Sequence, residues 1–339
     1  VQFPGTQRDI VTLGYVKDVH PENGRQKVLV ELATNLPGAP EAVEREIHQV
    51  LKRQGVPYEL QVNVRQMGGG PEGTPLGHGG PQAPPKDPLE KIRTKIAVAS
   101  AKGGVGKSTV AVNLAVGLAH LGVKVGLLDA DIHGPSIPLM LGIQGQRPEV
   151  EDNMIVPLDV FGVKTISIGV LIEADTAVIW RGPMVGKALE QLMSQVKWEG
   201  VDVLLMDLPP GTGDIQITLS QQTALDGGMV VTTPQDVALL DANRGVNMFQ
   251  KVNVPVLGIV ENMSTFVCPH CGEETPIFGS GGGRRVAGRL GVPLLAQIPI
   301  DAKVTSGGDT GHPIVAAEPE SPAGRAFLEL AEQTRKQIS

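Results

Sequence analysis

A glycine-rich octapeptide constrains the fold of this chain more than any other feature. Residues 102–109 read Lys-Gly-Gly-Val-Gly-Lys-Ser-Thr, and they follow directly on the apolar run 96–100. A helical pattern then continues to about Leu121. A strand, a glycine loop ending in Lys-Ser-Thr and a helix are the context that a phosphate-binding P-loop requires. The segment therefore predicts an α/β domain that binds a nucleotide.

The residue types of this loop suit the chemistry of phosphate. Glycines let backbone N–H groups approach the phosphates, and the helix N-terminus adds a partial positive charge. We predict that Lys107 neutralises the β and γ phosphates of ATP, and that the Ser108 hydroxyl ligates Mg²⁺. The remaining nucleotide-binding residues predicted in the loop are Gly103, Gly104, Val105, Gly106 and Thr109.

The loop departs from the general pattern at its first position. Ala101 stands where a glycine is usual, and Lys102 precedes the two glycines instead. In proteins with this deviant form, the additional lysine reaches a phosphate bound by a partner subunit. We therefore predict a catalytic role for Lys102 in addition to that of Lys107.

Carboxylates end two further apolar strands of the sequence. Asp129 and Asp131 follow the run that begins at Val125, and Asp207 ends the run that begins at Val203. A carboxylate at such a strand end, beside a P-loop, is expected to hold Mg²⁺ directly or through a water, and Asp207 fits this role. We predict that Asp129 or Asp131 orients the attacking water. Taken alone, each aspartate is equally compatible with a helix cap or a turn.

A glycine that follows the second of these strands is a candidate sensor of the nucleotide. Gly211 lies in the segment 207–214, which reads Asp-Leu-Pro-Pro-Gly-Thr-Gly-Asp. We predict that its backbone N–H contacts the γ phosphate.

Composition divides the chain into three stretches. Residues 1–66 read as a small α+β domain, and residues 67–90 are mostly Gly, Pro and polar, which predicts a flexible linker. Residues 91–339 alternate apolar strands with helices, which predicts a mostly parallel sheet covered by helices on both faces. The expected elements of the small domain are strands over 10–18, 27–32 and 58–64, a turn over 21–24, and a helix over 41–54 that buries Val43, Ile47, Val50 and Leu51. The expected strands of the large domain cover 96–100, 123–129, 163–169, 201–207, 228–233 and 254–261.

Charge and cysteine content exclude several classes of function. The net charge of −7 argues against a general affinity for nucleic acids. Two cysteines cannot form a disulfide framework, so we expect a reducing, cytoplasmic compartment. No apolar run approaches the ~20 residues of a membrane span. The final helix expected over 323–338 carries charges of both signs, which argues against binding to a membrane surface.

The two cysteines form a C-x-x-C motif, Cys268-Pro269-His270-Cys271. This spacing lets both thiolates reach one metal centre, but zinc and iron–sulfur sites usually take four ligands. The pair is therefore either a redox pair or half of a site that a second copy completes. A redox motif normally lies at a helix N-terminus after a strand, whereas this one is expected in an irregular loop. Two unrelated buried cysteines are the remaining alternative.

These motifs in combination resemble the Mrp/ApbC family of iron–sulfur cluster carrier ATPases over residues 91–335. The P-loop alone fits MinD-like or ParA-like ATPases equally well. Residues 1–66 resemble the small domain often fused to this family, although the cysteine that relatives often carry in the segment 34–40 is missing. The segments that carry the resemblance are the deviant loop, 129–136, Trp180-Arg181-Gly182-Pro183, 207–214, Glu261-Asn262-Met263 and the C-x-x-C motif.

The resemblance implies a homodimer that binds a [4Fe-4S] cluster through Cys268 and Cys271 of both subunits. It also implies ATP hydrolysis, often slow in this class, that is coupled to cluster loading or to cluster transfer to apo-proteins. The implied partners are apo iron–sulfur proteins and cluster-assembly scaffolds. Asn262, Pro299 and Asp301 match positions that contact the adenine in related ATPases. Neither nucleic acid nor membrane is implied as a partner.

Two other functions remain open from the sequence. A MinD/ParA-type positioning ATPase has the same P-loop, but it leaves the C-x-x-C motif unexplained. An ATPase with a structural zinc site is the second, because two cysteines alone do not distinguish zinc from an iron–sulfur cluster.

Overall fold

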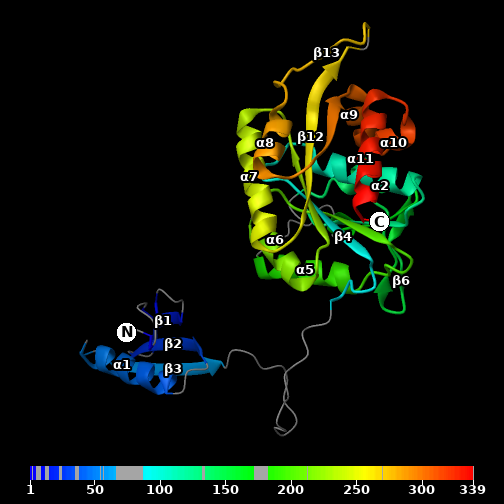
Figure 1. Ribbon diagram of the computed structural model, residues 1–339. Coiled ribbons are helices and arrows are strands. Elements are labelled where there is room, and N and C mark those ends of the chain that lie inside the picture. The colour runs from blue at the N-terminus through cyan, green and yellow to red at the C-terminus, as the bar shows by residue number, and fades with distance from the viewer. Residues whose placement is uncertain are drawn as a thin grey trace. The chain divides into compact units, whose positions relative to one another are not determined.

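The computed structural model divides the chain into two compact units, Val1–Gln82 and Ala83–Ser339 (Figure 1). The predicted linker falls almost entirely outside the residues that the structure describes, as do several residues of the motifs above. The described residues are 1, 3–4, 9–11, 15–22, 25–34, 38–53, 55, 57–65, 87–131, 134–171, 182–211, 213–268 and 270–338.

The first unit contains a three-stranded sheet with the order β1-β2-β3 in its described part. β1 pairs with β2 in the antiparallel sense, whereas β3 runs parallel to β2. Parallel neighbours need a crossover connection, and α1 lies between them in the sequence. The elements are β1 (Val16–Glu22), β2 (Arg25–Ala33), α1 (Ala39–Arg53) and β3 (Tyr58–Arg65).

A small core lies between this sheet and its helix. Val28, Val30 and Leu32 alternate along β2 and are buried, as period-two patterning requires. Val43 and Ile47 of α1 belong to the same core. This domain is the small α+β unit that the sequence predicts.

Two details of the first unit differ from the prediction. The strand expected over 10–18 begins at Val16 and continues to Glu22. Pro21, which suggests a turn, is compatible with this strand because β1 is an edge strand and Pro is tolerated there. Val50, expected on the buried face of the helix, is 43% exposed.

The second unit is built on a mostly parallel sheet. Within the described residues the strand order is β13-β12-β11-β4-β10-β5-β9-β8, and β14 pairs with β12. The antiparallel neighbours are β8 with β9 and β12 with β13. The strands are β4 (Thr94–Ala99), β5 (Val125–Asp129), β8 (Leu158–Val160), β9 (Val163–Ser167), β10 (Val203–Asp207), β11 (Gly227–Thr232), β12 (Val256–Val267), β13 (Glu274–Thr275) and β14 (Leu294–Ile300), and a separate pair is β6 (Val150–Glu151) and β7 (Met154–Ile155).

Helices cover both faces of this sheet. Figure 1 shows α5 to α8 on one face and α2 with α9 to α11 on the other. Among the described helices, none combines the length and the apolar character needed to cross a bilayer. The helices are α2 (Lys107–His120), α3 (Ile137–Met140), α4 (Ile168–Leu171), α5 (Gly182–Ser194), α6 (Asp214–Gln222), α7 (Asp236–Lys251), α8 (Gly282–Leu290), α9 (Ala302–Thr310), α10 (Ile314–Ala317) and α11 (Pro322–Ile338).

The central strands contribute to two hydrophobic cores at once. In β4, Ile96 and Val98 pack in the core under α2 and α11, while Ala97 and Ala99 pack in the core under α5 and α7. A strand buried on both faces reads as a continuous apolar run, which is the pattern of the sequence. The predicted fold class, a P-loop-type α/β domain with both faces of the sheet covered, is confirmed.

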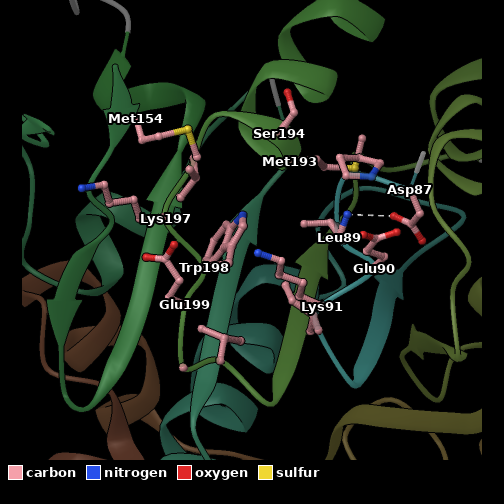
Figure 2. A pocket seen from close by; sticks show the side chains of 15 residues that line it. Asp87, Leu89, Glu90, Lys91, Met154, Met193, Ser194, Lys197, Trp198 and Glu199 are labelled. Atoms are coloured by element: carbon pink, nitrogen blue, oxygen red, sulfur yellow. Dashed lines mark hydrogen bonds between the residues drawn. The ribbon is translucent and has the colours of Figure 1, made fainter. Parts of the chain in front are cut away.

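The second unit begins before the predicted linker ends. Leu89 is 1% exposed, and Asp87 accepts the Leu89 N–H at 2.8 Å and lies 3.6 Å from Lys95 Nζ. Residues 87–90, predicted as linker, therefore pack on this unit. Figure 2 shows the segment lining a pocket of about 450 Å³ together with Met193 and Trp198. This pocket lies where β4 and β10 begin, away from the strand ends that carry the P-loop.

Candidate functional site

The P-loop closes against the strand β12. Gly106 has a φ of 79°, and a Cβ at this position would lie 2.2 Å from Asn262 Nδ2. The same Asn262 amide donates a hydrogen bond to the Val105 carbonyl oxygen at 2.9 Å. Only glycine satisfies both the left-handed backbone and the close contact. Asn262, predicted to contact the adenine, therefore also holds the loop in shape.

Lys107 lies among carboxylates at the start of α2. Its Nζ is 2.7 Å from Asp207 Oδ1 and 3.5 Å from Asp131 Oδ2. Lys107 is 6% exposed and Asp207 is fully buried. Burial raises the pKa of Asp207, and the charge of Lys107 opposes that rise. The structure thus brings together the cation and two of the three acidic residues predicted for the site.

The residues predicted for Mg²⁺ lie beside one another. The Ser108 hydroxyl donates to Asp207 Oδ2 at 2.5 Å. Asp131 Oδ1 is among the described buried oxygens that have no hydrogen-bond partner. Hydroxyl and carboxylate oxygens are the ligands that Mg²⁺ prefers, so this donor set fits the ion. When bound, Mg²⁺ would neutralise charge on the β and γ phosphates.

The register of the sheet aligns three polar residues in one row. Asp129 is the Cα partner of Asp207 on β10 and of Ser167 on β9. The Ser167 hydroxyl donates to Asp129 Oδ2 at 2.8 Å, and the Asp131 N–H donates to Asp129 Oδ1 at 3.1 Å. Asp129 is therefore turned into the protein, and Asp131 is the carboxylate that lies beside Lys107. Ser167 was not predicted from the sequence, because a serine at a strand end carries no distinctive signal.

Burial changes the acidity of the inward carboxyl group. Together with the neighbouring charge of Asp207, it raises the pKa of Asp129 to about 7. The hydrogen bonds from Ser167 and Asp131 act in the opposite direction. The pKa of Asp129 thus lies close to neutral pH.

The predicted sensor glycine is already hydrogen-bonded. The Gly211 N–H donates to the Ser100 carbonyl oxygen at 2.8 Å, so contact with a γ phosphate requires this bond to break. Gln216 holds the loop from the other side, because its Nε2 donates to the carbonyl oxygens of Pro209 at 2.9 Å and Gly211 at 3.1 Å. Gln216 was missed because a glutamine early in a helix gives no signal in the sequence.

Lys102 differs in its surroundings from Lys107. It is exposed, and it makes no ion pair within the described part of the chain. Its carbonyl oxygen accepts the Ser100 hydroxyl at 2.9 Å. The structure therefore does not bring Lys102 to the carboxylates, and its side chain is free to reach outward.

A cavity of about 480 Å³ continues from the P-loop. The predicted residues Gly106, Thr109, Asn262, Pro299 and Asp301 all line it. Asp301 also caps α9, where it accepts the Lys303 N–H at 2.8 Å. The structure thus brings the predicted adenine contacts together with the phosphate loop, in a volume typical of sites for small ligands.

The cysteines lie at the tip of a β-hairpin, where an irregular loop was expected. β12 continues past Glu261 to Val267 and pairs with β13, as Figure 1 shows. The Cys268 N–H donates to the Glu273 carbonyl oxygen at 3.0 Å, and the Gly272 N–H donates to the Cys268 carbonyl oxygen at 2.9 Å. Cys268 and Cys271 lie outside helices and strands, as expected, but their loop closes a hairpin that was not predicted, because the polar residues after Glu261 hide the continuation of the strand.

The thiols are accessible and unequal. Cys268 is half-buried and Cys271 is exposed. Backbone N–H groups of Cys271 and His270, hydrogen-bonded to the Cys268 sulfur, lower the pKa of that thiol. Within the described residues, no three Cys, His, Asp or Glu side chains are placed to hold a metal ion. The described part of one chain therefore offers two thiolates and no third ligand.

Some residues of the predicted motifs lie outside the described residues. They are Asn35, Leu36, Pro37, Ile132, His133, Trp180, Arg181, Thr212 and Pro269.

The fold and the site define a P-loop NTPase of the MinD/ParA type. The model of the ParA family described as NUBPL iron-transfer P-loop NTPase matches residues 91–335. The cell division ATPase MinD of Pyrococcus furiosus is 27% identical with a TM-score of 0.55, over 73% of this chain and 100% of that one. A nucleotide-binding protein of Archaeoglobus fulgidus in complex with ADP is 38% identical with a TM-score of 0.62, over 70% of this chain and 93% of that one.

Curated relatives extend the similarity to nearly the whole chain. The iron–sulfur cluster carrier protein of Haemophilus influenzae is 41% identical over 346 residues, covering 99% of this chain and 89% of the relative. An Arabidopsis thaliana iron–sulfur protein required for NADH dehydrogenase is 51% identical over 250 residues, covering 73% of this chain and 80% of the relative. The chain belongs to the family of iron–sulfur cluster carrier proteins, and the resemblance stated from the motifs is confirmed.

Proposed function

We propose that this chain is an ATP-hydrolysing carrier that holds a [4Fe-4S] cluster between two copies and transfers it to apo-proteins. The cysteine hairpin is the observation that carries the proposal. It presents two thiols at an exposed tip, and the pKa of Cys268 is lowered by N–H donors, which favours the thiolate that binds metal.

The number of ligands argues for a site shared between copies. A [4Fe-4S] cluster takes four thiolates, and Cys268 and Cys271 are the only cysteines in the sequence. Two chains together supply the four ligands. The cluster is the cargo of this protein, so a site at the surface of each chain suits both its loading and its release.

The nucleotide site supports ATP as the second ligand. Lys107 would bind the β and γ phosphates, and Ser108 and Asp207 would hold Mg²⁺. Asp131 has an unpartnered oxygen and lies beside Lys107, so it is suited to orient the attacking water. Asp129 would position Asp131 by accepting a hydrogen bond from the Asp131 N–H. The adenine would occupy the cavity at Asn262, which Pro299 and Asp301 also line.

Contacts made by the nucleotide would extend across the dimer. Lys102 is exposed and forms no ion pair with the described carboxylates of its own chain, so we propose that it contacts the phosphates bound by the partner. Gly211 would contact the γ phosphate after its bond to Ser100 is released. Dimer formation and hydrolysis would then depend on each other.

The relatives support the cellular role. The Haemophilus influenzae relative is named a cluster carrier, and the Archaeoglobus fulgidus neighbour was solved with ADP. We propose that apo iron–sulfur proteins receive the cluster and that assembly scaffolds supply it. An exposed free thiol at Cys271 favours a reducing compartment such as the cytoplasm.

Anaerobic reconstitution tests the shared cluster. The full chain is incubated with iron and sulfide, and absorbance, bound iron, bound sulfide and mass by light scattering are measured. We expect about two iron atoms per chain and the mass of two chains, because one cluster takes four thiolates. Zinc bound in preference to iron, or a monomer holding a complete cluster, would contradict the proposal.

A further inference from the structure

One strand connects the nucleotide cavity with the cysteines. Asn262 of β12 lines the cavity, and the same strand continues to Val267, next to Cys268. Met263 has a φ of 56°, a left-handed conformation that is unusual for a residue with a side chain. The pairing of β12 with β14 shifts register over the same stretch. The strand thus bends at the cavity before it enters the hairpin.

The returning arm of the hairpin comes back to the same cavity. Beyond β13, Ile277 and Phe278 line the cavity, as does the segment 299–301. Both are exposed, at 53% for Ile277 and 36% for Phe278. The hairpin therefore leaves the cavity at Asn262, carries the cysteines at its tip and returns to the cavity at these two apolar side chains.

We propose that Ile277 and Phe278 are binding residues for the adenosine part of the nucleotide, and that they couple nucleotide occupancy to the geometry of the cysteine turn. The inference rests on the adenine nucleotide proposed above as the occupant of the cavity. Gly106 and Thr109 connect this cavity directly to the phosphate loop, so a bound nucleotide extends into it. Apolar side chains that are exposed without a ligand gain burial when a base covers them.

The hairpin offers few other contacts that would fix its returning arm. β12 and β13 pair only through Phe266 with Thr275 and Val267 with Glu274 in the described residues. Contact of the base with Phe278 would therefore restrain the arm that ends at the cysteine turn. Because such coupling is reciprocal, ligands on the cysteines would also change the affinity for nucleotide.

The first experiment measures binding to the reduced, cluster-free full chain by calorimetry. Phe278→Ala is compared with Phe161→Ala, a control at a phenylalanine that is 39% exposed and lies outside the cavity. We expect Phe278→Ala to weaken ADP binding about tenfold, as loss of an aromatic contact with a base does. Binding of pyrophosphate stays unchanged in both variants, because it lacks the base.

The second experiment measures coupling through the rate of alkylation of the two thiols. Saturating ADP slows alkylation of the half-buried Cys268 at least about threefold in the wild-type chain, since a restrained turn exposes this sulfur less often. Pyrophosphate has no such effect, and Phe278→Ala abolishes the effect of ADP even at saturation. The protection must not depend on protein concentration, which distinguishes it from association of two chains.

The outcomes separate this inference from the proposed function. If the wild-type chain does not bind adenine nucleotides, the proposed function fails and this inference fails with it. If the wild-type chain binds ADP but Phe278→Ala shows the same affinity and the same protection of the thiols, only this inference is overturned. If Phe278→Ala loses pyrophosphate binding, its loop is damaged, and Ile277→Ala then decides by the same two measurements.

Discussion

Two regions of the second unit present their reactive groups in opposite ways. The nucleotide edge is the end of β4, β5 and β10 beside the P-loop, and the cysteine hairpin is β12 and β13 with the loop that carries Cys268 and Cys271. At the edge, Asp207 is fully buried and paired with Lys107, and Asp129 is held by Ser167. At the hairpin, Cys271 is exposed, and the described part of the chain offers no third metal ligand beside the cysteines. One region assembles its carboxylates and its buried cation within a single chain, whereas the other presents two thiols without a third metal ligand in the described residues.

The difference follows from what each region is proposed to do with its ligand. Parallel strands in register hold the groups of the nucleotide site at fixed positions, which suits repeated binding of one ligand. A cargo must be accepted and given away, so its ligands need access to partners. Loss of a side chain at either region should therefore leave the residues of the other region in place, so the two can be tested separately in the chain without a cluster.

The largest expected effect is the loss of the cluster from the hairpin. Cys268→Ala or Cys271→Ala should reduce bound iron after reconstitution from about two atoms per chain to almost none, because no other cysteine replaces the ligand. Affinity for ADP, compared between the cluster-free chains, should remain within about twofold, since the thiols do not line the nucleotide cavity. His270→Ala is the matched control and should keep the iron, because His270 serves Cys268 through its backbone. Retention of the cluster by Cys268→Ala would refute the shared site.

The next effect concerns the nucleotide edge alone. Lys107→Ala should lower ATP hydrolysis at least about 100-fold and weaken ATP binding, because the cation for the β and γ phosphates is lost. Lys102→Ala should keep the ATP affinity of the single chain and lose hydrolysis. Steady-state phosphate release and nucleotide titration measure these quantities, and circular dichroism checks the fold. Wild-type turnover in Lys107→Ala would be incompatible with the site.

A third effect is the pH dependence of stability. The pKa of Asp129 is about 7 in the folded chain and has an ordinary value of 3.8, so the folded state binds more protons between these values. Wild-type stability should therefore fall as pH rises from about 4 to about 7, by about 2–4 kcal/mol in total. Asp129→Asn should show a smaller decline, and the raised pKa of Asp207 accounts for what remains.

Urea unfolding without Mg²⁺ and nucleotide measures this dependence at pH 5 and pH 8. Asp159→Asn, at an exposed carboxylate on β8, is the control and should follow the wild-type curve. An unchanged pH dependence in Asp129→Asn would show that the inward carboxyl group does not titrate in this range.

A smaller effect compares the two thiols with each other. The pKa of Cys268 is lowered by N–H donors, so at pH 7 it should react with limiting iodoacetamide about threefold faster than Cys271, despite its lower exposure. The ratio should decline at alkaline pH, because the lowered pKa of Cys268 then gives that residue no further gain in thiolate. Mass spectrometry of the modified peptides measures it. A ratio that favours Cys271 at pH 7 would contradict the hydrogen-bonded turn.

Removal of the residues before Asp87 is expected to leave nucleotide and cluster binding unchanged. A chain that begins at Asp87 should bind ADP and a cluster as the full chain does, because both regions lie in the unit Ala83–Ser339. Calorimetry and iron analysis on the shortened chain test this. Aggregation or loss of nucleotide binding would show that the two units fold as one.

The nucleotide edge was largely predictable because its signals are local. The P-loop, Asp207 and the pair Asp129 and Asp131 each follow an apolar strand, and parallel strands end at the same edge of a sheet. The different positions of the two aspartates, Asp129 turned inward and Asp131 beside Lys107, were not predictable. They depend on the register that places Ser167 beside Asp129, and register between strands distant in sequence leaves no local pattern.

The hairpin was less predictable for a related reason. The strand expected to end at Glu261 continues to Val267, although Asn262 and Ser264 interrupt its apolar pattern. Ser264 donates its hydroxyl to the Ile298 carbonyl oxygen at 3.0 Å, so the polar interruption is satisfied by the neighbouring strand. The short partner strand, Glu274–Thr275, is too brief to show any periodicity.

The ion pair between Lys107 and Asp207 makes nucleotide entry resemble anion exchange. Lys107 Nζ lies 2.7 Å from Asp207 Oδ1, so a carboxylate of the same chain compensates the buried ammonium group. An incoming phosphate replaces one anion with another, and the net gain at Lys107 is the difference between two similar interactions. Lys107 would therefore contribute less to nucleotide affinity than its contact with a phosphate alone suggests.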